Sequence, residues 1–374
     1  MSEDLKQDLV RATRHYPPPQ DALERLASRR DHRRHVRRRA GLLLGVTAVA
    51  LFGGLVWLGL QLGHRQATGK PAGTPETPKN GELLYAKKAP EGWHLFAFDP
   101  SSGQEQELTH GIRDYGSDWS PDGTKIVYDS EAAGGSNIVV ANADGSDPVV
   151  IGTGEDPAWS PDGTRIAYAG DGGSIWVVNA DGSDAHSVTV GAAAGQDPGT
   201  GAPYDWNPAW SPDGRSIAYT RVVAHRFVPL AGQQGQVDVT LEQLRVWQEG
   251  TPPTDTILTD AYTYLGQVDW SPDGSTIVFT GAPTLFHEKE ATGYAWPRVL
   301  LIPSQGGHVT PISPDEQTWA AGATWSPDGT LIAYVDNNHS LVVMRPDGTD
   351  RRTLPIDPGD DEIIGPSWGV ARSG

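Results

Sequence analysis

The sequence contains no cysteine in its 374 residues. This absence excludes disulfide bonds, cysteine-based zinc and haem motifs, and any mechanism with a thiol nucleophile. Methionine (2) and phenylalanine (6) are also scarce, whereas glycine (45), proline (30) and tryptophan (13) are abundant. Such a composition is typical of many short strands joined by tight turns, and not of a helical protein.

Basic residues are few after the first 40 positions, so the charge divides the chain in two. Residues 1–40 hold 11 Lys/Arg against 6 Asp/Glu, whereas residues 41–374 hold 18 against 41. A surface this acidic repels a phosphate backbone. We therefore expect no nucleic-acid partner for the larger part.

One long uncharged apolar run, AGLLLGVTAVALFGGLVWLGLQLG, occupies residues 40–63. As a helix rising about 1.5 Å per residue, it crosses a hydrocarbon core of about 30 Å. The arginine-rich residues 29–39 precede it, so the positive-inside rule predicts a cytoplasmic N-terminus and an extracytoplasmic remainder. A cleaved signal peptide is the alternative, but its apolar region spans only about 7–15 residues. We expect a single-pass anchor in the cell membrane, in contact with the lipid bilayer through residues 40–63.

The segments on either side of this run are too short to bury a core of their own. Residues 1–39 form a basic cytoplasmic tail, and residues 64–80 form an extended linker rich in proline, glycine and threonine. We expect the tail to orient the anchor. A cytoplasmic regulatory partner for residues 1–39 is the alternative.

The motif WSPDG recurs five times in the rest of the chain. Its tryptophans are Trp119, Trp159, Trp210, Trp270 and Trp325. Ser-Pro-Asp-Gly is turn chemistry, in which serine accepts a backbone hydrogen bond, proline presets the backbone and glycine takes a positive φ. An alternating apolar run follows each turn, as in KIVYDS from Lys125, and a third and a shorter fourth strand pattern come after it. The repeat unit is therefore a four-stranded meander.

The five motif tryptophans and Trp368 are separated by 40 to 60 residues. Four-stranded repeats of about 40 residues or more are typical of a β-propeller. The run ELLYAK from Glu82 has no tryptophan strand before it, and GPSWGV from Gly365 has no strand after it. Joined, the two ends complete one unit. We predict an all-β, six-bladed β-propeller over residues 81–371, with a C-terminal strand that closes the first blade.

WSPDG followed by Ile-Ala-Tyr, with a downstream Asp-Gly turn, resembles the WD40-like propeller repeats of the TolB family over about residues 81–371. The resemblance implies a TolB-like propeller. It also marks a difference, because TolB is a soluble periplasmic protein with an α/β domain ahead of its propeller. Here a tail, an anchor and a linker take that place, so a role in the Tol–Pal system does not follow.

The sequence shows no catalytic set. Residues 365–369 match G-x-S-x-G, but Trp368 is in register with the repeat tryptophans and too few residues follow to complete a triad. HEKE from His287 lacks the second histidine of a zinc protease motif, and the other outer histidines, His94 and His110 among them, are scattered. We expect no enzyme activity, no cofactor, no metal site, and structural roles for the turn aspartates.

The links between strands fall on two faces of a propeller. The first-to-second and third-to-fourth links hold the tight Asp-Gly turns and define the turn face. The remaining links define the loop face and hold the long insertions 191–207, 222–242 and 281–296. Residues outside the repeat pattern, mostly aromatic, also collect on the loop face. As candidate ligand-binding residues we select Tyr115, Tyr204, Asp205, Trp206, Tyr262, Tyr264, Tyr294, Trp296 and Trp319.

Aromatic rings on loops held by a rigid ring form a recognition surface, although the same rings also serve to pack the loops onto the blades. We expect a membrane-anchored, extracytoplasmic, non-catalytic binding module for a protein, a peptide or an envelope polymer. The alternative is a transmembrane signalling regulator, in which an anti-sigma-like tail is coupled to an outer sensor propeller. The tail lacks the His/Cys zinc signature common in anti-sigma domains.

Overall fold

The structure is a computed structural model, and it describes residues 78–132, 135–191, 203–229, 236–259, 262–283, 286–287, 290–291, 296–314, 319–356 and 362–371. The predicted tail (1–39), the predicted membrane segment (40–63) and most of the linker (64–80) lie outside these residues. Within the described ranges, no helix has the length and apolar character needed to cross a bilayer.

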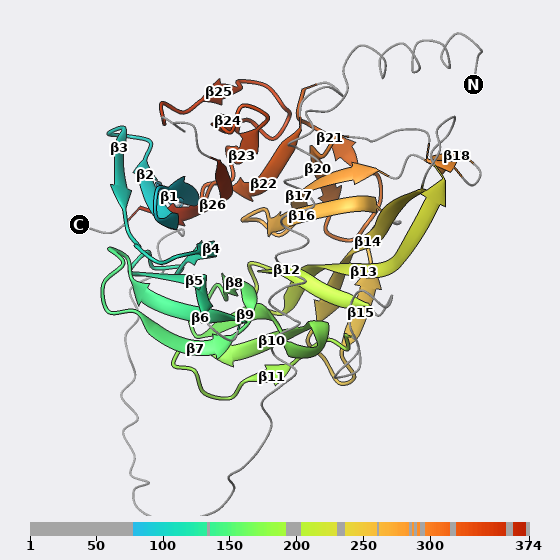
Figure 1. The fold of residues 1–374 in the computed structure, drawn as a ribbon, viewed down its shortest axis with the longest axis horizontal. Helices are drawn as coiled ribbons and strands as arrows, with labels where there is room; N and C mark the ends of the chain where they lie inside the picture. Colours follow the sequence, from blue (N-terminus) through green and yellow to red (C-terminus); the bar gives the residue numbers. More distant parts are fainter. Residues whose placement is uncertain are drawn as a thin grey trace, which may run out of the picture.

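The described chain is an all-β propeller, with sheets arranged around a common centre (Figure 1). Four of the sheets have four strands each. One holds β26 (Ile363–Val370), β1 (Asn80–Ala89), β2 (Gly92–Asp99) and β3 (Gln104–Glu107). The next along the chain holds β4 (Asp114–Trp119), β5 (Lys125–Ala132), β6 (Gly135–Asn142) and β7 (Val149–Thr153). A third holds β8 (Glu155–Trp159), β9 (Arg165–Gly170), β10 (Ser174–Asn179) and β11 (His186–Ser187). The fourth holds β22 (Ala320–Trp325), β23 (Ile332–Asp336), β24 (Leu341–Met344) and β25 (Arg352–Thr353).

A further sheet of eight strands contains two meanders. The first consists of β12 (Tyr204–Trp210), β13 (Ser216–Pro229), β14 (Gln236–Gln248) and β15 (Thr254–Ile257). The second consists of β16 (Tyr262–Trp270), β17 (Thr276–Pro283), β20 (Arg298–Pro303) and β21 (Thr310–Pro311). A single bridge pair, Glu242 with Tyr262, joins the two meanders. The short strands β18 (Phe286–His287) and β19 (Glu290–Ala291) pair with each other.

The first strand of each meander lies at the centre of the ring (Figure 1). β4, β8, β12, β16, β22 and β26 contact one another in cyclic order, and β26 returns to contact β4. The ring is therefore continuous around its centre.

The C-terminal strand closes this ring. β26 pairs antiparallel with β1, so that Trp368 lies opposite Leu83 and Ser367 lies opposite Leu84. The indole nitrogen of Trp368 also donates to the carbonyl oxygen of Gly81 at 3.1 Å. The predicted pairing of the two chain ends is confirmed.

The repeat motif forms the predicted turn. In the first copy, the Ser120 hydroxyl oxygen accepts the backbone N–H of Lys125 at 2.9 Å, and Asp122 Oδ1 accepts that of Thr124 at 3.0 Å. Gly123 has a φ of 69°, which favours glycine. The Ser120 hydroxyl, which donates to the same carboxylate, is the largest cause that lowers the pKa of Asp122. The motif residues are thus explained by turn geometry.

One predicted loop is a hairpin. β13 and β14 continue beyond their blade, and their pairing extends from Ser216 opposite Gln248 to Pro229 opposite Gln236. The insertion 222–242, expected as a long loop, therefore consists mostly of strand residues. The physical reason is visible in the sequence, because VVAHRFV and QVDVTLE are rich in β-branched and aromatic residues that favour paired strands.

The core lies between neighbouring blades. One cluster joins Val127 and Ile138 of one blade to Trp159, Ile166 and Tyr168 of the next. Both isoleucines are 0% exposed, and burial of each such side chain contributes roughly 1.5–3 kcal/mol relative to exposure. Because each cluster needs two blades, no blade buries its apolar surface alone, and the ring provides the rigid support on which a site can be built.

Candidate functional site

The predicted aromatic residues gather at one rim of the ring. β12 and β16 begin with Tyr204 and Tyr262, Tyr115 is the second residue of β4, and Trp319 directly precedes β22. Because every meander has the same strand order, the starts of these inner strands share one face, which is the loop face. All four side chains are partly buried.

Each of these rings also packs on a neighbour. The ring centroids of Trp93 and Tyr115 lie 5.3 Å apart, and those of Tyr204 and Trp206 lie 6.1 Å apart. The other two contacts are Tyr262 with Phe279 at 6.0 Å and Trp319 with His339 at 5.6 Å. The rings are thus held in place by the blades, and the part that stays exposed is presented rigidly.

Two further predicted residues lie on the same side of the ring. Tyr264 is partly buried near the start of β16, and Trp296 is partly buried two residues before β20. Tyr294 lies outside the described residues.

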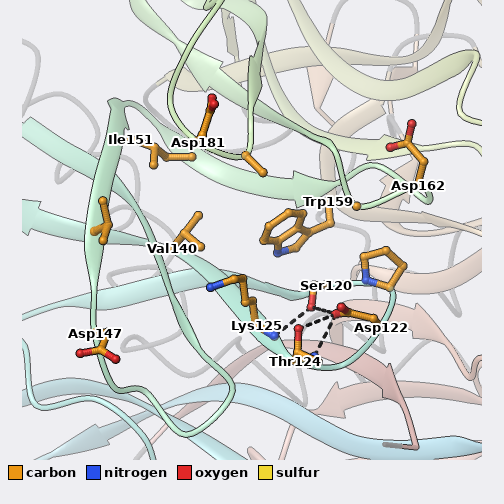
Figure 2. A pocket seen from close by; sticks show the side chains of 14 residues that line it. Ser120, Asp122, Thr124, Lys125, Val140, Asp147, Ile151, Trp159, Asp162 and Asp181 are labelled. Carbon is orange, nitrogen blue, oxygen red and sulfur yellow. Dashed lines mark hydrogen bonds between the residues drawn. The ribbon is translucent and has the colours of Figure 1, made fainter. Parts of the chain in front are cut away.

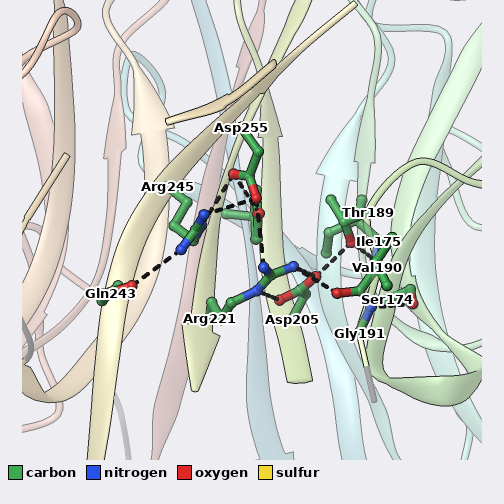
Figure 3. A network of polar contacts seen from close by, with 11 residues as sticks. Ser174, Ile175, Thr189, Val190, Gly191, Asp205, Arg221, Gln243, Arg245 and Asp255 are labelled. Atoms are coloured by element: carbon green, nitrogen blue, oxygen red, sulfur yellow. Dashed lines mark hydrogen bonds and ion pairs between the residues drawn. The ribbon is translucent and has the colours of Figure 1, made fainter. Parts of the chain in front are cut away.

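Asp205 has a different position from the one expected. It is 0% exposed, and its carboxylate accepts two hydrogen bonds from the Arg221 guanidinium, at 2.6 and 2.7 Å (Figure 3). Burial raises the pKa of Asp205, although the Arg221 charge and the Thr189 hydroxyl oppose that effect. Asp205 is therefore a buried structural residue beneath the loop face and is not exposed to a ligand.

The ion pair of Asp205 with Arg221 belongs to a larger polar network that was not predicted from the sequence. Asp255 accepts a hydrogen bond from the Tyr219 hydroxyl at 2.8 Å and pairs with Arg245 at 2.9 Å and Arg221 at 3.5 Å. Arg221 also donates to the carbonyl oxygen of Val190 at 3.1 Å (Figure 3). The network therefore fixes the backbone at Val190, three residues after β11.

Two exposed hydrophobic residues stand in the links that lead into the inner strands. Val190, held by the network above, is 86% exposed, and Ile112, in the link before β4, is 73% exposed. Neither belongs to the repeat pattern, and neither was selected from the sequence. Exposed apolar side chains beside half-buried aromatic rings are typical of an interaction surface.

Two half-buried aspartates join the inner strands deeper in the ring. Asp118 accepts the backbone N–H of Trp159 at 2.8 Å and the hydroxyl of Ser367 at 2.8 Å. Asp269 accepts the backbone N–H of Trp325 at 2.8 Å, again from the next blade. The hydroxyl of Ser367 thus donates to a structural carboxylate, which is not the environment of a nucleophilic serine.

Burial raises the pKa of both carboxyl groups. For Asp269 the pKa rises to about 7, because desolvation and the charge of Asp118 outweigh the hydrogen bonds from Trp325 and Thr324. For Asp118 the direction is the same, against hydrogen bonds from Trp159 and Ser367. A pKa near neutrality can mark an active site. Here both groups are fully engaged between blades, so a structural role accounts for them.

Two histidines that the sequence left scattered lie together. The Nδ1 atoms of His94 and His110 lie 2.5 and 3.2 Å from the same Oε1 of Glu107. The prediction that these histidines are scattered is wrong, because β2 pairs with β3 and places Phe96 opposite Glu107.

The ligand atoms of these three residues lie within 4.8 Å of one another, and two imidazoles with one carboxylate form a donor set that suits Zn²⁺. The set fits a metal by its chemistry. In the described structure, both Nδ1 atoms face the carboxylate, whereas the buried Nε2 of His94 has no hydrogen-bond partner among the described residues. The hydrogen bonds from His94 and His110 lower the pKa of Glu107, although burial, the largest single influence, opposes them.

The fold is similar to that of several solved structures. TolB from Acinetobacter baumannii has a TM-score of 0.55 and 20% identity, over 77% of this chain and 66% of that one. A putative TolB from Agrobacterium tumefaciens has a TM-score of 0.50 and 18% identity, over 77% of this chain and 98% of that one. A chain in a nidogen/laminin complex has a TM-score of 0.55 and 12% identity, over 78% and 99%.

At these identities the likeness concerns the fold, and the described part of the chain is a TolB-like β-propeller. The chain spans just under two thirds of the Acinetobacter TolB. No protein-family model and no curated protein matches the sequence.

Proposed function

We propose that the protein is a membrane-anchored, extracytoplasmic propeller that binds a protein, a peptide or an envelope polymer without catalysis, through its loop face. One observation carries this proposal: half-buried aromatic rings stand at the starts of four inner strands, and Ile112 and Val190 are exposed in the links beside them. Rigid rings lose little conformational entropy on binding, and they supply much of the binding energy at protein interfaces.

The ring that carries this face has six blades in our proposal. The two meanders of the eight-stranded sheet each count as one blade, because Glu242 with Tyr262 is the single pair that links them as neighbouring strands among the described residues. The six inner strands in cyclic contact support this number. Of the solved structures with a similar fold, one comes from a complex of two proteins, nidogen and laminin, which supports a binding role for this architecture.

The anchor and the orientation rest on the sequence. The uncharged residues 40–63 and the basic residues 29–39 before them favour a single span with the propeller outside. The linker 64–80 then separates the ring from the bilayer, so the loop face is accessible to partners in the envelope.

Photo-crosslinking tests the binding face. A photoreactive phenylalanine analogue replaces Ile112 or Val190 on the loop face, and the control carries it at Asp347 on the turn face, which is also exposed. We expect the loop-face positions to give a discrete crosslinked species in living cells that the control position lacks. Identical crosslinking at all three positions, or none at the loop face, would contradict the proposal.

A further inference from the structure

A hollow of about 460 Å³ opens on the turn face, between the blade of β4–β7 and the blade of β8–β11 (Figure 2). Its lining includes Lys125, Asp147, Val149, Trp159 and Asp181. Val149 is 57% exposed at the edge of the hollow, whereas Trp159 is 7% exposed and is the last residue of β8. The hollow therefore combines an aromatic floor with a polar rim.

The equivalent position between the blade of β8–β11 and the blade of β12–β15 is filled by a side chain of the protein itself, Arg165. The guanidinium carbon of Arg165 lies 4.6 Å from the ring centroid of Trp210. The same guanidinium donates to the carbonyl oxygen of Gly214 at 3.2 Å. This internal contact shows which chemical group suits the space beside a repeat tryptophan.

The two places correspond residue by residue. The sequences SPDGTK (120–125) and SPDGTR (160–165) stand in the same turn, so Lys125 takes the position of Arg165. Trp159 then corresponds to Trp210, and Gly163 corresponds to Gly214. The packing is also the same, since a side-chain carbon on Gly163 would lie 3.3 Å from Pro121, and one on Gly214 would lie 3.4 Å from Pro161.

Lys125 does not reproduce the contact that Arg165 makes. Its side chain is exposed, and within the described residues it has no cation–π contact with Trp159. A lysine ammonium is a compact, strongly hydrated charge, whereas a guanidinium is planar and stacks on an indole. The hollow therefore remains open at a position where the next blade is filled.

The charge of the hollow favours a cation. Asp122, Asp147, Asp162 and Asp181 line it, against the single positive charge of Lys125. Hydrogen bonds, first that of the Ser160 hydroxyl, lower the pKa of Asp162 to about 2, so this carboxylate is ionised at neutral pH.

The hollow also has an unused donor. The indole nitrogen of Trp159 is buried and has no hydrogen-bond partner among the described residues. Figure 2 shows this nitrogen on the side of the ring that faces Ser120 and Lys125. A carbonyl oxygen of a bound polypeptide can accept from it.

We propose that this hollow binds an arginine side chain of a partner polypeptide. The guanidinium stacks on Trp159 and donates to the carbonyl oxygen of Gly163, as Arg165 does at Trp210 and Gly214. The surrounding aspartates complement its charge. The site lies on the turn face, goes beyond the loop-face function proposed above, and does not depend on it.

The first test uses short peptides with the full-length protein. Acetyl-Gly-Arg-Gly-amide is titrated, and binding is followed through the indole N–H resonance of Trp159, assigned with a Trp159→Phe variant. The controls replace arginine by lysine or by citrulline, which has the same shape without the charge. We expect at least tenfold weaker binding of both controls. Equal binding of the three peptides, or no binding of the arginine peptide, overturns the proposal.

Two variants test the correspondence between the blades. Lys125→Arg supplies the guanidinium from within, so we expect at least a tenfold loss of peptide binding with an unchanged melting temperature. Arg165→Ala vacates the space beside Trp210, so we expect a second binding event there, seen at the Trp210 indole resonance. Unchanged binding by Lys125→Arg, or no response of Trp210 in Arg165→Ala, contradicts the proposal.

A Trp206→Ala variant, which alters the loop face, should bind the peptide normally. Failure of the turn-face site is therefore distinguishable from failure of the loop-face site.

Discussion

The indole nitrogen of Trp368 donates to the carbonyl oxygen of Gly81, 287 residues earlier in the chain, at 3.1 Å. This bond lies within the β26–β1 pairing, which closes the ring. Removal of β26 would expose the edge of β1 and interrupt the cyclic contacts of the inner strands, because β26 contacts both β22 and β4.

We therefore expect deletion of residues 362–374 to abolish the single cooperative thermal transition, or to lower its midpoint by at least 10 °C. The control deletes only residues 372–374 and keeps Ala371, whose backbone N–H donates to the carbonyl oxygen of Lys79. Scanning calorimetry distinguishes the two. Equal transitions in both truncations would show that closure does not stabilise the ring.

Asp118 connects three blades, since it accepts from Trp159 of the next blade and from Ser367 of the closing strand. The substitution Asp118→Ala leaves both donors buried without an acceptor, and each unsatisfied donor costs about 1–3 kcal/mol. We expect the free energy of unfolding, measured in urea, to fall by about 2–6 kcal/mol in total. Glu91→Ala, at an exposed turn, serves as the control and should change stability by less than about 0.5 kcal/mol.

Asp269 makes the stability of the protein depend on pH. Because its pKa is raised from 3.8 to about 7 in the folded state, the folded protein holds this proton more tightly than the unfolded chain. The resulting stabilisation is fully present below the unfolded pKa and is lost as the pH rises through about 7. At one pKa unit per 1.36 kcal/mol, the full effect is at most about 4 kcal/mol.

The substitution Asp269→Asn removes this titration and keeps an oxygen that can accept from Trp325. We therefore expect urea midpoints of Asp269→Asn to vary less between pH 4 and pH 7 than those of the unchanged protein. Parallel pH profiles for the two proteins would mean that Asp269 does not carry the effect.

The sequence was sufficient to predict the turns and the closure, because both are local or periodic. Ser120 and Asp122 form their turn through contacts within six residues, and the register of Trp368 follows from the same repeat. The buried position of Asp205 was not predictable in this way, since it depends on Arg221, sixteen residues away on the neighbouring strand.

The same limit applies to the candidate sites. The contact of His94 with Glu107 follows from the pairing of β2 with β3, so the expected hairpin register was a signal that could have found it. The exposure of Ile112 and Val190 had no such signal, because irregular links carry no periodicity from which a buried or exposed side can be derived.

The absence of cysteine makes the membrane topology directly testable. Single cysteines are introduced by Ser2→Cys in the tail and Gln106→Cys on the exposed strand β3. In right-side-out membrane vesicles, we expect a membrane-impermeant maleimide to label Gln106→Cys alone, and to label Ser2→Cys only after detergent is added. Labelling of the tail without detergent would contradict the proposed orientation.

The loop face is tested most directly by quantitative capture from cell envelopes. Full-length protein is compared with a Trp206→Ala/Trp319→Ala variant, and with an Asp181→Asn variant of the turn face whose conservative change leaves the loop face intact. We expect at least one partner to be recovered at equal levels with Asp181→Asn and to be reduced at least tenfold with the double variant, while the melting temperature of the double variant stays within a few degrees. The same partners in the same amounts from all three proteins would contradict binding through the aromatic rim.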